Sequence, residues 1–195
     1  MRPRFVLATA NSDKAREIAD ILGSEVQLEP RPAEVPDVEE TGRTLLDNAR
    51  LKAQALVRAT GLPAVADDTG LEVEWLDGAP GVYSSRFAGE AATYAENVAK
   101  LLRELNGVSN RRARFRTVAI AAWPGGREVV AEGTVDGTIA AAPSGQGGFG
   151  YDPVFVPDEG DGRTFAEMVD ESPEVKHRLS HRGRAFSALA AQLGR

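Results

Sequence analysis

The sequence predicts an α/β fold, and three local patterns support this prediction. Residues 4–8 are an apolar run of strand length, and residues 13–22 follow with apolar side chains at helical spacing. Residues 44–59 show the same helical spacing, and the apolar residues 62–66 after them predict another strand. Residues 114–135 contain two strand-like runs separated by a glycine-rich turn. Strands and helices that follow one another in this way are typical of a sheet covered by helices.

Capping and breaking residues set the boundaries of the first elements. Either Asn11 or Ser12 is suited to cap the first helix, and Gly23 ends it. Residues 27–38 contain three prolines, so we expect an extended connector there. Gly61, which is followed by a leucine and a proline, ends the second helix.

The rest of the chain is predicted from alternation, turn residues and helical spacing. The expected elements are a half-exposed strand at residues 71–75, a helix at 93–105, strands at 114–123 and 128–135, a loop at 145–150, a strand at 154–156 and a closing helix at 183–193. Because residues 114–135 differ in composition from the first half, we expect them to form an antiparallel lobe. We expect residues 1–195 to make up a single domain.

The composition is that of an ordinary globular protein and argues against several kinds of site. A chain of 195 residues can bury a substantial core, and its apolar runs are too short to span a membrane. With no cysteine and two histidines, disulfides, thiolate catalysis and zinc sites are not expected. The N-terminal apolar run stops at Ala10, so we expect no signal peptide and a cytoplasmic protein.

The distribution of charge favours a small anionic ligand. The formal net charge of −6 argues against broad binding to nucleic acid. Four basic residues nevertheless lie within nine positions: Lys176, Arg178, Arg182 and Arg184. A local basic patch on an acidic protein suits a small anion better than a polymer, although a solvated helix end explains Arg178 and Arg184 equally well.

Paired carboxylates follow the predicted strand at residues 62–66. Asp67 and Asp68 are followed by Thr69-Gly70, which predicts that the strand ends there, at the edge of a sheet where open α/β folds bind ligands. Crowded carboxylates repel one another unless a cation lies between them, and Mg²⁺ with a polyphosphate suits such a site. Glu40 and Asp152 are the other candidate acids. Taken alone, the pair also fits a solvated turn.

The segment Thr9-x-Asn11-x-x-Lys14 lies on the first strand-to-helix turn. Backbone N–H groups at a helix N-terminus attract phosphate, and a lysine in the first turn adds a positive charge. A capped helix with a solvated lysine is the alternative interpretation. The segment lacks the spaced glycines of a Walker A loop.

The glycine-rich segment 145–150 formally matches G-x-G-x-x-G. We reject a dinucleotide site, because that motif needs a following helix, whereas residues 151–156 predict a strand. The glycines suit a loop around a flat ligand, with Phe149 or Tyr151 stacking on a base. A glycine-rich β-turn is the alternative.

Residues 180–183, Ser-His-Arg-Gly, are a further candidate for contact with a base or with phosphates. His181 is equally compatible with a surface position at a helix N-terminus. A Ser-His-Asp triad is conceivable but disfavoured, because Ser180 and His181 are adjacent and no G-x-S-x-G motif is present.

Together these segments resemble the inosine/xanthosine triphosphate pyrophosphatase family, which hydrolyses nonstandard purine nucleoside triphosphates. The resemblance covers nearly the whole chain in order. The matching segments are residues 7–14, Glu39-Glu40-Thr41-Gly42, Asn48-Ala49 with Lys52-Ala53, residues 66–71, residues 78–87, residues 147–153, Lys176 and residues 180–183. Thr69 stands where the family often has serine, which keeps the hydroxyl, and residues 106–127 match only loosely.

The resemblance implies a mixed central sheet with flanking helices, in two lobes around a nucleotide-binding cleft, and a homodimer. It implies hydrolysis of ITP, dITP, XTP and dXTP to the monophosphate and pyrophosphate with Mg²⁺, which removes deaminated purines from the precursors of DNA and RNA. Glu40 and Asp68 would bind Mg²⁺, and Asp68 would also activate water. The implied substrate-binding residues are Thr9, Asn11, Lys14 and Lys52 near the phosphates, and Thr69, Arg86, Phe149, Gly150, Tyr151, Asp152, Lys176, His181 and Arg182 around the rest of the nucleotide.

Three other functions compete with this interpretation. A related Maf-type pyrophosphatase would act on modified pyrimidines, but Phe149 and the segment 180–182 favour a purine. A regulatory module would bind ITP without releasing pyrophosphate. A nucleic-acid-binding domain would show salt-dependent binding to DNA, and the net charge of −6 disfavours it.

Overall fold

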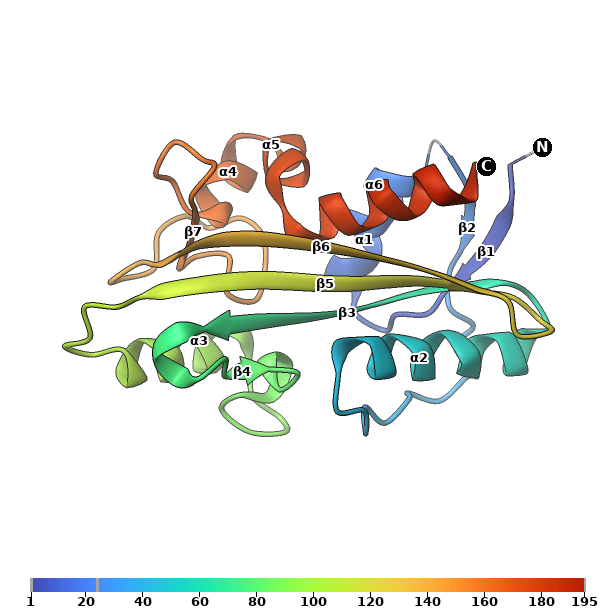
Figure 1. Ribbon diagram of the computed structural model, residues 1–195, viewed down its shortest axis with the longest axis horizontal. Coiled ribbons are helices and arrows are strands. Elements are labelled where there is room, and N and C mark those ends of the chain that lie inside the picture. Colours follow the sequence, from blue (N-terminus) through green and yellow to red (C-terminus); the bar gives the residue numbers. More distant parts are fainter. Residues whose placement is uncertain (1, 24, 195) are drawn as a thin grey trace. The chain divides into compact units, whose positions relative to one another are not determined.

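The computed structural model describes residues 2–23 and 25–194, which form a mixed sheet of seven strands with helices around it (Figure 1). The strand order is β2-β1-β3-β5-β6-β7, and β4 pairs with β3 beside this path. β1 runs parallel to β2 and β3, whereas β3–β4 and β6–β7 are antiparallel. The predicted fold class, a mixed α/β sheet with flanking helices, is therefore confirmed.

The elements have the following bounds. The strands are β1 Arg4–Leu7, β2 Gln27–Glu29, β3 Ala64–Val73, β4 Pro80–Gly81, β5 Arg112–Ala122, β6 Glu128–Ile139 and β7 Phe155–Pro157. The helices are α1 Ser12–Leu22, α2 Leu45–Thr60, α3 Tyr94–Glu104, α4 Phe165–Glu171, α5 Pro173–Leu179 and α6 His181–Leu193, with the 3₁₀ turns η1 Glu74–Leu76 and η2 Ser84–Arg86. Among the described residues, no helix is both long and apolar enough to cross a membrane.

The chain divides into two compact units. Unit 1 comprises the described residues within 1–68, 117–133 and 182–195, and unit 2 comprises residues 69–116 and 134–181. The division passes through the strands β3, β5 and β6, each of which contributes residues to both units. In β3 it falls between Asp68 and Thr69.

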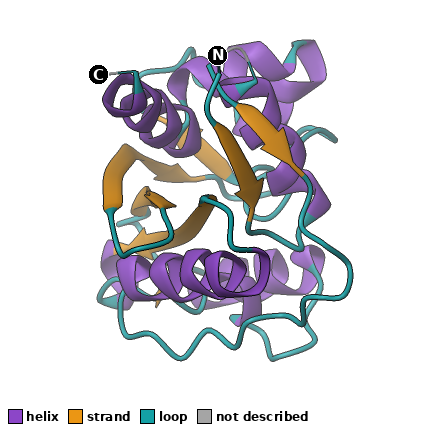
Figure 2. Ribbon diagram, turned by 90° about the vertical axis from the view of Figure 1, so that its right-hand side faces the viewer, coloured by secondary structure: helices purple, strands orange, loops and turns teal. Residues whose placement is uncertain are grey.

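Unit 1 consists of strands with helices on both faces, α2 on one and α1 with α6 on the other (Figures 1 and 2). Side chains of successive strand residues point to opposite faces. Accordingly Ala64 and Ala66 of β3 pack with Ala49 and Ala53 of α2, whereas Val65 packs on the other side in a cluster with α1 and α6. The small side chains allow α2 to approach the sheet closely.

Unit 2 has a separate apolar core. It is formed by residues from α3, α4 and the strand parts of this unit: Leu71, Val98, Leu101, Phe115, Phe155, Phe165 and Met168 are among its members. The capping box Thr93–Glu96 begins α3, and the box Thr164–Glu167 begins α4. These caps fix where α3 and α4 begin, and both helices contribute buried residues to this core.

The largest difference from the predicted elements concerns Asp67 and Asp68. The strand does not end at this pair: β3 continues through Thr69 and Gly70 to Val73. The predicted strand at residues 71–75 is thus the second half of β3, followed by η1. Gly70 serves the pairing with β4 rather than a turn, because an added Cβ would lie 2.7 Å from the carbonyl oxygen of Gly81.

Several other boundaries also differ. The predicted connector at residues 27–38 begins with β2, whereas Asn11, one of the two predicted caps, does cap α1. The strands β5 and β6 form a hairpin within the central sheet rather than a lobe of their own, because each continues through both units. Residues 151–154 are a turn, so the strand after the glycine-rich loop starts only at Phe155.

The helices α4 and α5 were not predicted, and α6 begins two residues earlier than expected. Each of the two missed helices has seven residues, too few for helical spacing to stand out. Their starts do carry local signals: the Thr164–Glu167 capping box, and Ser172 as N-cap with Pro173 at the first helical position.

Candidate functional site

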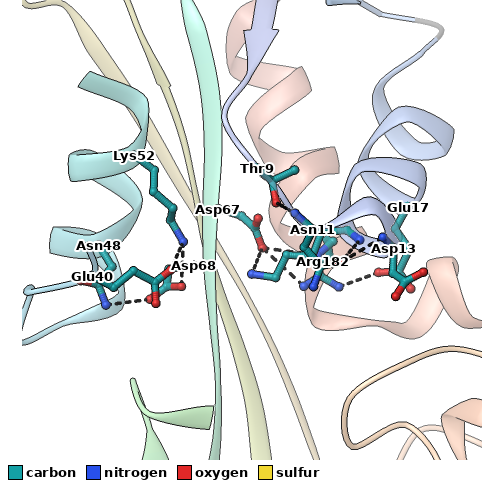
Figure 3. A network of polar contacts seen from close by, with 11 residues as sticks. Thr9, Asn11, Asp13, Glu17, Glu40, Asn48, Lys52, Asp67, Asp68 and Arg182 are labelled. Carbon is teal, nitrogen blue, oxygen red and sulfur yellow. Dashed lines mark hydrogen bonds and ion pairs between the residues drawn. The ribbon is translucent and has the colours of Figure 1, made fainter. Parts of the chain in front are cut away.

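The buried Asp68 carboxylate is the centre of a polar cluster in unit 1 (Figure 3). Its Oδ1 accepts a hydrogen bond from Lys52 Nζ at 3.0 Å, and its Oδ2 accepts one from Asn48 Nδ2 at 3.1 Å. Lys52 Nζ also donates to Glu40 Oε1 at 2.8 Å. Three residues that the sequence analysis selected, Glu40, Lys52 and Asp68, thus meet around one ammonium group.

Burial and neighbouring charges shift the pKa values of Asp68 and Lys52, and the shift of Asp68 suits a general base. Burial raises the pKa of Asp68 above its usual value of 3.8, and the positive charges of Lys52 and Lys14 oppose that shift without cancelling it. Burial acts to lower the pKa of Lys52, but Asp68, Asp67 and Glu40 outweigh it and raise the pKa. Lys52 therefore stays charged, and Asp68 holds a proton more tightly than an exposed aspartate does.

Asp67 belongs to a second buried cluster, on the opposite side of β3 (Figure 3). Its Oδ2 lies 3.4 Å from Lys14 Nζ of α1 and accepts hydrogen bonds from the Arg182 guanidinium of α6 at 3.4 Å. Arg182 also donates through Nη1 to Glu17 of α1. Burial lowers the pKa of Lys14, although Asp67 counteracts this. The two carboxylates, Asp67 and Glu17, are thus paired with two cationic side chains, Lys14 and Arg182.

The turn before α1 places Thr9 and Asn11 at the N-terminus of the helix. Asn11 Oδ1 caps α1 by accepting hydrogen bonds from the backbone N–H groups of Asp13 and Lys14, at 2.9 and 3.1 Å. Thr9 Oγ1 accepts from the backbone N–H of Asn11 at 3.2 Å. The positive end of an eleven-residue helix and the Lys14 ammonium are thereby combined, an arrangement suited to phosphate.

In unit 2, Asp152 organises the glycine-rich loop. Its Oδ2 accepts hydrogen bonds from Lys176 Nζ at 2.7 Å and from the backbone N–H of Phe149 at 2.9 Å. Lys176 Nζ lies 5.0 Å from the centre of the Phe149 ring, and both Lys176 and Asp152 are buried. Gly148 allows this close approach, because a Cβ at this residue would collide with the Asp152 carboxylate.

The other predicted base-binding residues of unit 2 make contacts of their own. Buried Tyr151 donates from its hydroxyl to the carbonyl of Ser84 at 2.9 Å, and burial raises the pKa of this tyrosine. Ser84 begins η2, which carries Arg86, whose guanidinium lies 5.2 Å from the Tyr83 ring centre. His181 stacks on Phe115 at 4.3 Å. Of the two remaining predicted residues, Gly150 has a positive φ of 63°, and Thr69 lies in β3.

The predicted residues therefore divide between the units. The residues assigned to the phosphates and the metal all belong to unit 1: Thr9, Asn11, Lys14, Glu40, Lys52 and Asp68. Those assigned to the base belong to unit 2, except for Arg182, which belongs to unit 1 with Asp67 and Glu17. The four basic residues near the C-terminus do not share one environment, because Lys176 and Arg182 are buried and are paired with carboxylates in different units.

The sequence analysis gave no role to Asn48, which it named only as part of a matching segment, and did not select Glu17; both contact predicted site residues. Each lies on the same helix face as a selected lysine: Asn48 is four residues before Lys52, and Glu17 is three residues after Lys14. This spacing was the available signal. Whether such a helix face is buried depends on what packs against it, and a local sequence pattern does not show this.

Comparisons with known proteins identify relatives that match nearly the whole chain. A model of the Ham1 family matches residues 5–192. A dITP/XTP pyrophosphatase of Rhodospirillum centenum is 47% identical over 193 residues, covering 96% of this chain and 93% of that protein. A dITP/XTP pyrophosphatase of Geobacillus kaustophilus is 48% identical over 194 residues, with 96% and 93% covered.

Solved structures give the same result. A HAM1 protein from Coxiella burnetii superposes with a TM-score of 0.88 at 40% identity, covering 98% of each chain. A nucleoside-triphosphatase / dITP/XTP pyrophosphatase from Mycobacterium abscessus gives a TM-score of 0.74 at 44% identity, covering 95% of this chain and 98% of that one. The resemblance found in the sequence is thus confirmed, and the chain belongs to the Ham1 family.

Proposed function

We propose that this protein hydrolyses the nonstandard purine nucleoside triphosphates ITP, dITP, XTP and dXTP to the nucleoside monophosphate and pyrophosphate. The observation that carries the proposal is the Glu40–Lys52–Asp68 cluster, in which Lys52 pairs with Glu40 and with the buried Asp68 carboxylate. It provides a carboxylate base beside a fixed positive charge, in a chain 47% identical to a dITP/XTP pyrophosphatase. Transfer at phosphorus depends mainly on positioning and charge neutralisation, which such a cluster supplies.

Magnesium is the cofactor that the cluster fits. The Glu40 and Asp68 oxygens lie 2.8 and 3.0 Å from the same ammonium nitrogen, so the two carboxylates already converge on a positive charge. Within residues 2–23 and 25–194, no group of three or more acidic, histidine or cysteine residues forms a complete metal cage. Mg²⁺ is commonly held by one or two carboxylates together with substrate phosphates and waters, which matches this donor set. Glu40 and Asp68 would hold the ion, which when bound neutralises phosphate charge.

The residues of unit 1 act on the phosphates and on water. Asp68 orients the attacking water and accepts its proton, for which the raised pKa makes it a stronger base than an exposed aspartate. Lys52 keeps the Asp68 carboxylate in place and offsets charge on the phosphates. Lys14, together with Thr9 and Asn11 at the start of α1, binds the triphosphate.

The residues of unit 2 bind the purine. Phe149 stacks on the base, and the loop is fixed by the hydrogen bond from its backbone N–H to Asp152. Lys176 and His181 contact the base edge. A site that hydrogen-bonds the 6-keto group rejects an amino group there, because buried polar groups would be left badly paired, an effect of up to about 10⁴-fold. Arg182 supports the phosphate-binding side instead, since its guanidinium contacts Asp67 and Glu17.

The proposed role in the cell is removal of deaminated purine nucleotides before they enter DNA or RNA. We place the enzyme in the cytoplasm, where these nucleotides are used, and propose a homodimer on the basis of its family resemblance. Light scattering coupled to size-exclusion chromatography tests the oligomeric state, with a mass near 41.6 kDa expected for two chains of 20.8 kDa (2 × 20.8).

The decisive experiment measures pyrophosphate release from ITP, dITP, XTP, ATP, GTP and dTTP, with and without Mg²⁺. The proposal predicts Mg²⁺-dependent release from the first three and little from the others. Release from dTTP in preference to ITP would point to a pyrimidine enzyme. Tight ITP binding without release of pyrophosphate would point to a regulatory module.

A further inference from the structure

Asn48 is a completely buried polar residue on the face of α2 that carries Lys52. It precedes Lys52 by one helical turn, so both side chains point towards β3. Their neighbours on this face, Ala49 and Ala53, are small and apolar. A buried amide has to find hydrogen-bond partners within the protein, because leaving it without them destabilises the fold by about 1–3 kcal/mol.

The two ends of the Asn48 amide contact two different parts of the site. Oδ1 accepts a hydrogen bond from the backbone N–H of Gly42 at 2.8 Å, and Nδ2 donates to Asp68 Oδ2 at 3.1 Å. The orientation is unambiguous, because the reversed amide would place its NH₂ group against an N–H and its oxygen against a carboxylate. Asn48 therefore connects a backbone donor, Gly42, with a carboxylate acceptor, Asp68; Figure 3 shows the contact with Asp68.

Gly42 lies two residues after Glu40, in the loop that leads into α2. A Cβ at this position would lie 2.5 Å from Asn48 Oδ1 and 2.6 Å from the Asp47 Cβ. The absence of a side chain at Gly42 is thus what allows the loop backbone to reach the amide. The position of the Glu40 loop depends on this approach.

Lys52 and Asn48 together hold both oxygens of the Asp68 carboxylate, Oδ1 by the ammonium and Oδ2 by the amide. Two donors on different oxygens oppose rotation of the carboxylate. The same pair holds the Glu40 loop, Lys52 through the Glu40 side chain and Asn48 through the Gly42 backbone. Asp68 and the Glu40 loop are therefore connected twice, through one charged and one neutral side chain.

We propose that Asn48 is a positioning residue for the hydrolysis, which sets the orientation of the Asp68 carboxylate and at the same time the place of the Glu40 loop. The inference rests on the proposed function, in which Asp68 activates water and both carboxylates hold Mg²⁺. It predicts that removal of the amide lowers kcat more than it raises KM, because Lys14 and the start of α1, which bind the triphosphate, do not contact Asn48.

The test compares Asn48→Ala with the wild type and with Leu56→Ala, a core variant of the same helix that serves as a control for lost stability. For Asn48→Ala we expect kcat for dITP to fall roughly 10- to 100-fold, the range seen when groups that support metal ligands are removed. KM should change less than about threefold, and Leu56→Ala should retain the wild-type kcat when both variants are assayed well below their Tm. Equal kcat values for Asn48→Ala and the wild type would overturn the proposal.

A second variant reaches the same contact from the loop, and a second measurement does not depend on turnover. Gly42→Ala should reproduce the fall in kcat, because its Cβ displaces the amide. In a titration with MgCl₂ alone, both variants should bind Mg²⁺ more weakly than the wild type, roughly 10-fold or more. Wild-type kcat and Mg²⁺ affinity in Gly42→Ala would contradict the inference even if Asn48→Ala failed to fold. An inactive wild-type protein would instead refute the proposed function.

Discussion

Asp67 and Asp68 are neighbours in β3, yet their carboxylates contact different helices on opposite sides of the strand (Figure 3). Asp67 pairs with Lys14 of α1 and Arg182 of α6, whereas Asp68 is held by Asn48 and Lys52 of α2. The cause is the alternation of side chains along a strand. Two adjacent acids therefore have separate surroundings, and we expect their substitution to have separate consequences.

The substitution Asp68→Asn should lower kcat by about 10²- to 10⁴-fold, the usual contribution of a general base, while nucleotide affinity stays within a few-fold. Asp67→Asn is the matched control, because it removes a carboxylate that contacts Lys14 rather than Lys52. Its main effect should be on KM for the triphosphate. Steady-state pyrophosphate release and calorimetric binding of the nucleotide give the two quantities. Wild-type turnover in Asp68→Asn would remove Asp68 from the mechanism.

Lys14 and Lys52 should have opposite effects on stability. Burial lowers the pKa of Lys14, so the folded protein disfavours the ammonium form, and this cost is present at every pH below the lowered pKa. Lys14→Met should therefore raise the free energy of unfolding at pH 7, and the gain should vanish as the pH rises through the usual lysine pKa of 10.5.

For Lys52 the sign is reversed. Burial opposes its charge, but Asp68, Asp67 and Glu40 together raise the pKa, so the ammonium stabilises the fold below 10.5 and this contribution is lost as the pH rises through the raised pKa. Lys52→Met should accordingly lower the free energy of unfolding at pH 7. Urea denaturation in the absence of Mg²⁺ and nucleotide gives the free energy of unfolding of both variants and of the wild type. If the free energy of unfolding at pH 7 rose in both variants, or fell in both, this account would be contradicted.

Phe149→Ala should weaken nucleotide binding by about 1–3 kcal/mol, the typical contribution of one stacked base. KM for dITP should rise accordingly, with a smaller change in kcat. Tyr94→Ala is an informative comparison, because the Tyr94 ring lies 5.8 Å from that of Phe149 and is partly exposed. A large effect for Tyr94→Ala without one for Phe149→Ala would assign the stacking to Tyr94.

The buried Lys176–Asp152 pair should be strongly coupled. Lys176→Met leaves the Asp152 carboxylate buried without its ammonium partner, and the expected loss of stability is about 3–5 kcal/mol. The double variant Lys176→Met with Asp152→Asn should recover most of that loss, because no uncompensated charge remains. Urea denaturation of the wild type, both single variants and the double variant completes the cycle. Additive losses would show that the two side chains are independent.

Local patterns in the sequence were sufficient for the elements with strong caps or long apolar periods. Capping residues narrowed the start of α1 to Asn11 or Ser12, apolar spacing located α3, and the fold class and the family were both predicted correctly. The short helices α4 and α5 were missed, because seven residues contain fewer than two helical repeats.

The site was harder to predict, because its charges are buried by parts of the chain far apart in sequence. Two adjacent aspartates followed by Thr69-Gly70 predicted the end of a strand, because that pattern is typical of a turn. β3 continues through them because Lys14, Lys52 and Arg182 supply compensating charge from three helices. The hydrogen bonds of Asn48 depend on Gly42 and Asp68, a proximity that the sequence does not contain.

The alternation in β3 also bears on how the length of this strand can change in evolution. Inserting or deleting one residue ahead of Asp67 would turn each carboxylate towards the other's helix, because a shift of one position exchanges the two faces. Exchanging one small apolar residue for another in the same stretch leaves both directions intact. Single-residue length variation is therefore selected against here far more strongly than a change of side chain.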